Sequence, residues 1–257
     1  MAVPGPIDRF SDGCSVDDGF PPGLGGQGGD AVAAAYDAIA AEYDAQVAGD
    51  AWMRRVLWGR YAALFRPGQH ILDVGCGSGA DAIFLARRGV RVTGIDVSPA
   101  MTGYLRSRAT DLGLDNVEPI TATAIDLPLP DRSASVIVSN YVYHHLNDAD
   151  KQQGLAEAFR VLQPGGRIVI GDMMFRPELG DRRNRRVIIS KVKSFLSKGP
   201  AGVWRLLKNL LRYAAGQWEQ PADPEWWRHA LEQAGFIDVE LQPLEHEGGI
   251  VSGRRPA

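Results

Sequence analysis

The sequence predicts an α/β fold: a mostly parallel seven-stranded sheet with helices on both faces and a helical insert before the last two strands. Three observations support this prediction. Short apolar runs alternate with helical patterns between residues 70 and 172, and such alternation is typical of a parallel sheet covered on both faces. A glycine-rich loop follows the first apolar run. Two further strand patterns after residue 235 indicate an antiparallel edge.

Composition and length agree with a globular protein. The chain has 257 residues, 45% apolar and 23% charged, with a net charge of −3, which excludes a disordered, collagen-like or coiled-coil chain. It contains no run of 18 apolar residues, so we expect no membrane-spanning helix. Its first ten residues do not resemble a secretory signal. The only two cysteines, Cys14 and Cys76, exclude a disulfide framework, and we expect a cytoplasmic protein.

Residues 1–30 are expected to form a flexible acidic leader. They include eight glycines, four prolines and five aspartates, a composition that buries too little apolar surface to fold. At Asp30, which is placed to cap a helix, the pattern changes and predicts helices over 30–47 and 52–65. One domain is therefore expected over 31–257.

The alternating segment predicts five strands and three helices. Strands are expected over 70–74, 90–96, 116–121, 134–140 and 166–172, with helices over 80–88, 99–112 and 149–162. A helix over 225–234 and strands over 236–244 and 249–255 complete the sheet.

Residues 176–217 form the predicted helical insert. The segment 176–213 carries eleven Arg or Lys and two acidic residues, and its apolar residues recur at helical spacing. We expect basic amphipathic helices that act as a substrate lid or cap. Peripheral contact of residues 181–213 with an anionic membrane surface and pairing in a homodimer stay open as alternatives. No nucleic-acid partner is expected, because the chain is acidic overall and shows no known binding module.

The loop after the first strand indicates the ligand. Gly75, Gly77 and Ala80 match the pattern of dinucleotide-binding loops, which is weak evidence alone. Asp73 stands two positions before the first glycine, where a carboxylate repels a pyrophosphate and attracts an ammonium group. Asp96 ends the second strand, where an acid can accept hydrogen bonds from ribose hydroxyls. The pattern favours a ligand that joins adenosine to a positively charged amino acid.

Candidate catalytic residues follow the fourth and fifth strands. His144 and His145 come after the fourth strand, and Asp172 ends the fifth. A histidine can deprotonate a hydroxyl near neutral pH. In an extended chain only one of two consecutive rings would reach the substrate, and Asp172 would orient a histidine. We expect no metal site, and Cys76 is interpreted as a small residue in a tight turn.

Four segments in this order resemble a known family. ILDVGCGSG, GIDVSPAM, LPLPDRSASVIVSNYVYHHL and EAFRVLQPGGRIVI are similar to motifs of the S-adenosylmethionine-dependent methyltransferases, whose sheet is Rossmann-like. Within that family the chain resembles the small-molecule group that includes the ubiquinone and menaquinone methyltransferases. The resemblance covers residues 30–172 and the terminal strands.

The resemblance implies S-adenosyl-L-methionine as cofactor and a role for each matching residue. The glycine-rich loop would hold the methionine part, the second strand the ribose and adenine, and Asn140 would line the sulfonium. Thr123 stands where the family often has an acid that meets the adenine. Tyr36 and Tyr43 resemble the leading helix that covers the cofactor. The implied cofactor-binding residues are Tyr36, Tyr43, Asp73, Gly75, Gly77, Gly79, Asp96, Val97, Thr123, Ala124, Ile125 and Asn140.

The expected activity is transfer of a methyl group to a small, hydroxyl-bearing or amphiphilic acceptor in a biosynthetic reaction, with a histidine base. O-methylation is favoured over C- or N-methylation. Two alternatives stay open: a nicotinamide-dependent oxidoreductase, and a non-catalytic protein that binds the cofactor and a partner.

Overall fold

The computed structural model describes residues 29–40, 51–62, 65–175, 180, 182–214, 219–244 and 247–257. Most of the expected leader and Tyr43 lie outside these residues. No helix in the described part of the chain is long and apolar enough to cross a membrane.

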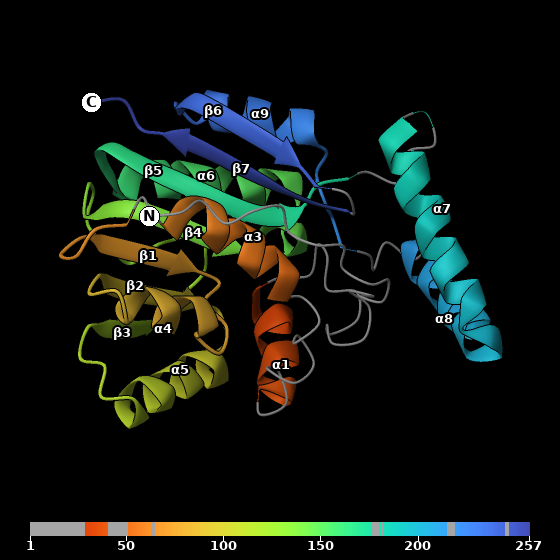
Figure 1. Ribbon diagram of the computed structural model, residues 1–257, viewed down its shortest axis with the longest axis horizontal. Helices are drawn as coiled ribbons and strands as arrows, with labels where there is room; N and C mark the ends of the chain where they lie inside the picture. Colours follow the sequence, from red (N-terminus) through yellow and green to blue (C-terminus); the bar gives the residue numbers. More distant parts are fainter. Residues whose placement is uncertain are drawn as a thin grey trace, which may run out of the picture.

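A single seven-stranded sheet forms the centre of the molecule (Figure 1). The strands lie in the order β3-β2-β1-β4-β5-β7-β6; the first five are parallel, and β7 is antiparallel to both of its neighbours. This arrangement confirms the predicted fold class. The strands are β1 (His70–Val74), β2 (Arg91–Asp96), β3 (Val117–Thr121), β4 (Ala134–Asn140), β5 (Leu162–Met173), β6 (Ile237–Pro243) and β7 (Gly248–Arg254).

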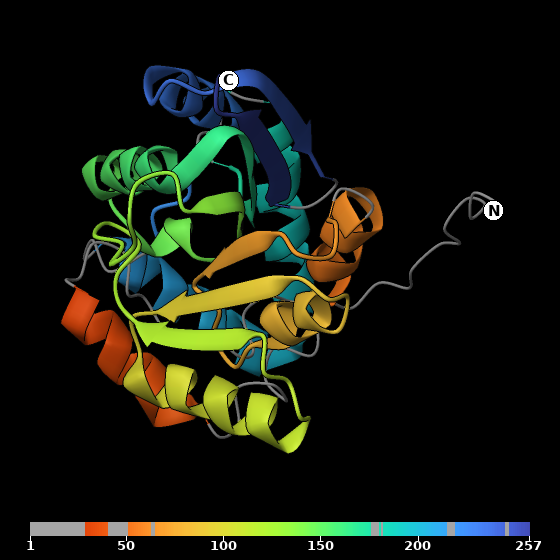
Figure 2. The same ribbon diagram turned by 90° about the vertical axis from the view of Figure 1, so that its left-hand side faces the viewer.

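Helices cover both faces of the sheet (Figures 1 and 2). Helices α3 (Ala51–Tyr61), α4 (Ala80–Ala86) and α5 (Pro99–Asp111) contribute to the core on one face. Helices α6 (Asp148–Val161) and α9 (Pro224–Gln233) contribute to the core on the other. Alternate residues of each central strand enter the two cores, as Ile71 and Leu72 of β1 do, because successive side chains of a strand point to opposite faces.

Helix α1 (Gly29–Ile39) lies beside the carboxyl ends of the parallel strands (Figure 1). The carboxylate of Asp37 fixes it there, because it accepts hydrogen bonds from the Ser98 hydroxyl and the Ala100 backbone N–H at the start of α5. A negative charge at that position is also favoured by the helix dipole of α5. The predicted cap was wrong, since the helix begins at Gly29 and Asp30 lies in its first turn.

Helices α7 (Arg182–Ser197) and α8 (Gly199–Ala214) follow β5 and precede α9 in the sequence. The two helices pack against each other. Figure 1 shows them beyond the carboxyl ends of the parallel strands, on the same side of the sheet as α1. Val187 of α7 is buried and belongs to the core that also contains Phe175, so α7 contacts the main body of the protein.

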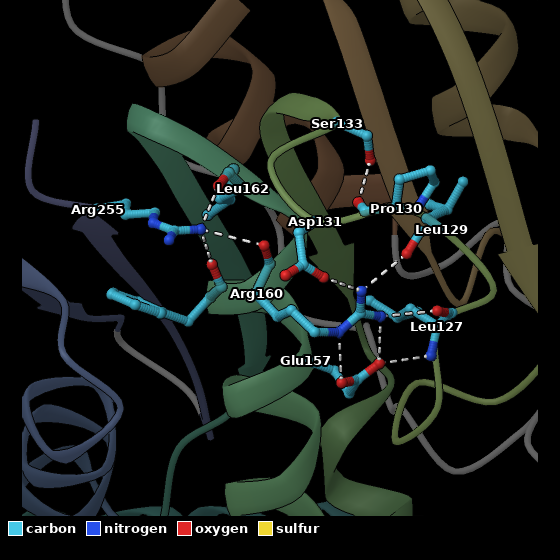
Figure 3. Close-up of polar contacts among 10 residues, drawn as sticks. Leu127, Leu129, Pro130, Asp131, Ser133, Glu157, Arg160, Leu162 and Arg255 are labelled. Carbon is cyan, nitrogen blue, oxygen red and sulfur yellow. Dashed lines mark hydrogen bonds and ion pairs between the residues drawn. The ribbon is translucent and has the colours of Figure 1, made fainter.

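An arginine network holds the end of α6 to the loop before β4 (Figure 3). The guanidinium of Arg160 donates to the backbone oxygens of Leu127 and Leu129 and pairs with Glu157 and Asp131. The hydrogen bonds from Arg160 hold the pKa of the Glu157 carboxyl below its usual value. This network lies at the opposite end of the sheet from α1, so it supports the fold and not the candidate site.

Some predicted boundaries differ from the observed ones. Strand β5 begins at Leu162, four residues before the expected start, and its register shifts between the pairs with Ala134 and Val136. The first residues of β5 belong to the strand because their backbone pairs with β4. This segment is rich in glycine and proline, so it has no hydrophobic pattern that would predict a strand. Helix α4 ends at Ala86 because the chain turns at Gly89, which has a positive φ of 76°.

Candidate functional site

A glycine-rich turn connects β1 to α4 at the carboxyl edge of the sheet. Gly75, Gly77 and Gly79 all have positive φ, at 74°, 51° and 86°, which residues with a Cβ rarely adopt. A Cβ at Gly75 would collide with Val142, and one at Gly79 with Leu105. The glycines therefore let α5 and the segment after β4 approach the turn.

Asp73 is buried in β1 directly before this turn, 2% exposed. Burial raises the pKa of its carboxyl well above the ordinary value, and the nearby charges of Asp81 and Asp96 add to the effect, while Arg54 opposes it. Among the described residues, Oδ2 of Asp73 has no hydrogen-bond partner. A buried carboxylate in this environment favours a cationic ligand.

Asp81, in the first turn of α4, was not singled out from the sequence. Its Oδ1 accepts a hydrogen bond from Nε1 of Trp58 at 2.6 Å and lies 2.8 Å from Nε of Arg54. Both partners come from α3, so this cluster joins α3 to α4 beside Asp73. The sequence indicates Asp81 only as an acidic residue in the first turn of a predicted helix. An acidic residue at that position normally indicates only that it stabilises the helix.

Asp96 fixes the conformation of the turn. Its Oδ2 accepts from the Gly77 N–H at 2.8 Å, and its Oδ1 accepts from the Ser98 N–H at 2.9 Å. Burial raises the pKa of the carboxyl, while these hydrogen bonds oppose the shift. Each carboxylate oxygen has a second lone pair, so hydroxyl groups of a ligand can still donate to it. Val97 follows and faces the start of α1, 3.7 Å from where a Cβ of Gly29 would lie.

Residues 123–125 form a half-buried turn beside the end of β2. The Thr123 hydroxyl accepts the Ile125 N–H at 3.4 Å, and the Ala122 N–H donates to the backbone oxygen of Asp96 at 3.0 Å. The structure thus brings residues 123–125 to the edge of the sheet near Asp96. Thr123 Oγ1 already serves the turn, as a hydroxyl in this position commonly does.

Asn140 ends β4 on the other side of β1. Its Nδ2 lies 3.4 Å from Oδ2 of Asp81, and its Oδ1 is buried with no hydrogen-bond partner in the described structure. The next residue, Tyr141, has a positive φ of 58°, an unfavourable conformation for a bulky side chain. This strained residue turns the chain out of β4 and into the two histidines.

His144 and Asp172 form a buried pair at the ends of β4 and β5. Nδ1 of His144 lies 2.6 Å from Oδ1 of Asp172, and the His144 N–H donates to Oδ2 at 3.2 Å. Burial lowers the pKa of His144, but the charge of Asp172 and its hydrogen bond outweigh burial, so the pKa is raised overall. The pair therefore favours a proton on His144.

The ring of His145 lies against that of His144, with centroids 4.0 Å apart, and also contacts Tyr36 of α1. Its Nε2 lies 2.8 Å from the hydroxyl of Tyr36, and Nδ1 is buried without a hydrogen-bond partner in the described chain. Burial holds the pKa of His145 well below the ordinary value, and the charge of His144 lowers it further. The chain is not extended here as expected: Tyr143–His145 form a 3-10 turn, which lets both rings be buried with different partners.

The residues at this edge fit the cofactor that the sequence resemblance implies. The buried Oδ2 of Asp73 and Oδ1 of Asn140 are acceptors without partners among the described residues, and both belong to the cluster that includes Asp81. Two unsatisfied acceptors, one of them a carboxylate, close to the second carboxylate of Asp81 match an ammonium or sulfonium cation and disfavour a diphosphate.

Cys76 lies within the turn but is not available as a nucleophile. Its side chain is buried at 7% exposure. Burial raises the pKa of the thiol well above its ordinary value, and the charges of Asp96 and Asp73 raise it further. The protein therefore keeps this residue as a neutral thiol.

Comparison with known proteins gives a consistent result. Residues 71–166 match a family described as a methyltransferase domain. A 27-O-demethylrifamycin SV methyltransferase from Amycolatopsis mediterranei is 34% identical over 70% of this chain and 68% of its own length. A demethylmenaquinone methyltransferase from Tropheryma whipplei is also 34% identical, over 69% of this chain and 70% of its own.

Solved structures share the fold. The cyclase SpnF aligns over 91% of this chain and 99% of its own length, with a TM-score of 0.64 and 20% identity. The S-adenosylmethionine-dependent methyltransferase SibL aligns over 86% of this chain and 62% of its own, with a TM-score of 0.60 and 21% identity.

Proposed function

The chain belongs to the S-adenosylmethionine-dependent methyltransferases, and we propose that it methylates a hydroxyl group of a small amphiphilic acceptor with His145 as the base. The main support for this proposal is the burial, lowered pKa and hydrogen bonding of His145. Its ring is buried, its pKa is lowered well below the ordinary value, and Nδ1 has no hydrogen-bond partner among the described residues. A neutral imidazole with a lone pair available is the form that accepts a proton.

The contact with Tyr36 supports Nδ1 as the reactive atom. When Nε2 carries the proton and donates it to the Tyr36 oxygen at 2.8 Å, the lone pair resides on Nδ1. The neighbouring His144, paired with Asp172, adds a positive charge that keeps His145 neutral. His144 would thus act as a positioning residue, and His145 would act as the catalytic residue.

The bound cofactor supplies a methyl group already activated by attachment to a sulfonium. Asp73 would bind the ammonium group of its amino acid part, Asp96 would accept the ribose hydroxyls, and Asn140 would lie near the sulfonium. The cofactor would supply this methyl group to the acceptor oxygen and would leave as the neutral thioether. The hydroxyl proton passes to Nδ1 of His145.

Alignment is the main work left to the protein in such a reaction. Holding two reactants in line can lower a barrier by about 7–11 kcal/mol in favourable cases. In this cluster Asp73 and Asp81 are buried and Arg54 pairs with Asp81; because the three residues come from a strand and two helices, we expect the cluster to be rigid. It would hold one reactant in place while the segment 141–145 holds the base.

The relatives support an acceptor with an apolar part. One is named for a 27-O-demethylrifamycin and another for demethylmenaquinone. The first name places the methyl group on an oxygen, which agrees with a histidine base. The second name does not say which atom is methylated. In this chain, the proposed base His145 is therefore the feature that favours O-methylation.

Labelled cofactor and a panel of hydroxyl-bearing amphiphiles, each paired with its O-methylated counterpart, test the proposal. We expect mass analysis to place the label on oxygen, and only for acceptors with a free hydroxyl. His145→Gln should lower kcat by about 10²- to 10⁴-fold with little change in S-adenosylhomocysteine affinity. His229→Gln in α9 is the control and should not change kcat. A label on carbon or nitrogen, or an unchanged kcat for His145→Gln, would refute the hydroxyl and base assignments.

The fold alone does not establish methyl transfer, because SpnF, which is named as a cyclase, shares it. If the chain kept only binding, S-adenosylhomocysteine would bind but no acceptor in the panel would receive a label. Membership of the methyltransferase family favours methyl transfer over nicotinamide chemistry. Binding of a nicotinamide dinucleotide in place of S-adenosylhomocysteine would contradict the whole assignment.

A further inference from the structure

Helix α8 carries an exposed apolar stripe that nothing in the candidate site explains. Four large apolar side chains on it are exposed: Val203, Trp204, Leu207 and Leu211. At about 100° of turn per residue, these positions fall within an arc of about 100° on one side of the helix. Trp204 and Leu211 are each 71% exposed, so the stripe is open to solvent and has no partner in the described part of the chain.

The stripe lies on the side of α8 that faces away from α7. Gly202 is a contact point with α7, since a Cβ there would collide with the backbone oxygen of Phe195. On the helix, position 202 lies about 150° from the centre of the stripe. Helix α7 contacts the main body through Val187, which is buried. The apolar stripe is therefore not used in the packing of α8 against α7.

The charge of this hairpin limits what can cover the stripe. Residues 182–214 contain ten Arg or Lys and no Asp or Glu, so the rest of a chain with net charge −3 carries −13. On α7, exposed Ile189 and Leu196 lie on the same side as exposed Arg182, Arg185 and Lys193. A second copy of the hairpin would bring ten more cations against these, which opposes a symmetric dimer through this surface.

We propose that the α7–α8 hairpin binds the surface of an anionic phospholipid bilayer, with the stripe of α8 inserted among the lipids. Helices with a strongly basic face and an apolar side that includes Trp are typical of such binding. Anionic headgroups match the cations, and the acyl region matches the exposed apolar side chains. A nucleic acid would neutralise the cations but would leave Trp204 and Leu211 exposed to water.

Sedimentation of the full chain with vesicles tests this proposal. We expect binding to phosphatidylcholine vesicles that contain phosphatidylglycerol, and no binding to phosphatidylcholine alone. Added salt should weaken the binding, because the screening length falls from about 30 Å at 0.01 M to about 10 Å at 0.1 M. The double variant Trp204→Ser, Leu211→Ser should reduce the partition coefficient by about tenfold or more.

Two controls make the result specific. Leu112→Ser changes another exposed apolar side chain, 43% exposed, at the end of α5 and should bind vesicles like the unmodified chain. Because the substituted side chains are exposed, thermal unfolding should show that all variants remain folded. The test does not depend on methyl transfer, so it can fail while the proposed function stands.

Three results would overturn the proposal. One is no binding to anionic vesicles at low salt. Another is equal binding by the stripe variant and the unmodified chain. The third is binding of a DNA or RNA duplex that competes with the vesicles and is unaffected by the stripe variant, which would identify a nucleic-acid surface.

Discussion

The hydroxyl oxygen of Tyr36 lies 2.8 Å from Nε2 of His145, although 109 positions separate the two residues in the sequence. Their rings also meet edge to face, with centroids 5.6 Å apart. The contact joins α1, which Asp37 anchors to α5, to the turn that carries the proposed base. Under the proposed mechanism, helix α1 would orient the base as well as cover the bound cofactor.

Tyr36→Phe removes this hydrogen bond and keeps the ring. A typical hydrogen bond contributes about 0.5–1.5 kcal/mol, so we expect kcat to fall about three- to tenfold. The affinity for S-adenosylhomocysteine should change little, because the aromatic cover remains. Steady-state kinetics and calorimetric binding measure the two quantities. Tyr104→Phe on the exposed side of α5 is the matched control, and equal kcat values for Tyr36→Phe and this control would show that the contact does not orient His145.

Asp73→Asn tests the electrostatic basis of cofactor binding. The substitution keeps the shape and removes the negative charge that would bind the ammonium group. We expect S-adenosylhomocysteine to bind about 10- to 100-fold more weakly, as loss of one partner from a buried charge pair commonly costs a few kcal/mol. Calorimetry measures this change, and Asp111→Asn at the exposed end of α5 should leave it unaffected.

The same substitution should stabilise the ligand-free protein. The raised pKa of Asp73 means that the folded state disfavours its charge at neutral pH, so removal of that charge relieves an unfavourable term. The free energy of unfolding in urea should rise without ligand, while the gain on adding S-adenosylhomocysteine should shrink. A variant that is both less stable without ligand and normal in binding would show that Asp73 has only a structural role.

The sheet could be predicted because its strands bury continuous apolar runs. All five residues of β1 are buried, which is typical of a central parallel strand. The predicted boundaries were wrong where backbone geometry, and not the pattern of side chains, determines where an element begins. Examples are the start of β5 near Leu162 and the start of α1 near Asp30. Hydrogen bonding between backbone atoms leaves little trace in the sequence.

The candidate site could be predicted only in part. Asp73 and Asp96 occupy fixed positions relative to the glycine-rich turn, so their location followed from the strands. Arg54 and Trp58, which hold Asp81, come from a helix whose register against α4 depends on packing. The separate partners of His144 and His145 depend on the turn that follows Tyr141, whose positive φ no sequence pattern indicated.

His70 predicts a pH dependence of stability that is independent of the site. At the start of β1, its Nδ1–H donates to the backbone oxygen of Ser133, and Nε2 accepts from the Thr93 hydroxyl at 2.8 Å. Burial lowers the pKa of His70 below the ordinary value of 6.5. The unfolded chain therefore takes up this proton first as the pH falls, so the stabilisation is present above about pH 6.5 and is lost below it.

His70→Gln removes this titration. Between about pH 6.5 and pH 5, the free energy of unfolding should fall less steeply for the variant than for the unmodified chain. Urea unfolding at several pH values measures the slopes. S-adenosylhomocysteine affinity should stay the same, because His70 lies at the amino end of β1. Equal slopes for both proteins would show that His70 takes up its proton equally in the folded and unfolded states.

Arg255 provides the clearest test of how the C-terminal segment stabilises the fold. Its Nη1 donates to the backbone oxygens of Phe159, Arg160 and Leu162 at the end of α6 (Figure 3). The Arg160 oxygen also accepts from the Arg132 N–H, and a cation at this end of α6 complements the helix dipole. Arg255→Met keeps an apolar stem but removes both the donors and the guanidinium that lies over the Phe159 ring, so we expect a loss of about 2 kcal/mol in unfolding free energy.

The adjacent Arg254 is the matched control for the substitution of Arg255. It pairs with Asp238, whose side chain is 59% exposed, and such surface ion pairs contribute about 0–1 kcal/mol. Arg254→Met should therefore cost clearly less than Arg255→Met, although both remove one guanidinium from the same strand end. Chemical denaturation of the two variants in parallel measures the difference. Since solvent can replace Asp238 as a partner but reaches the carbonyls of α6 poorly, equal losses would mean that water satisfies those carbonyls and that Arg255 does not cap the helix.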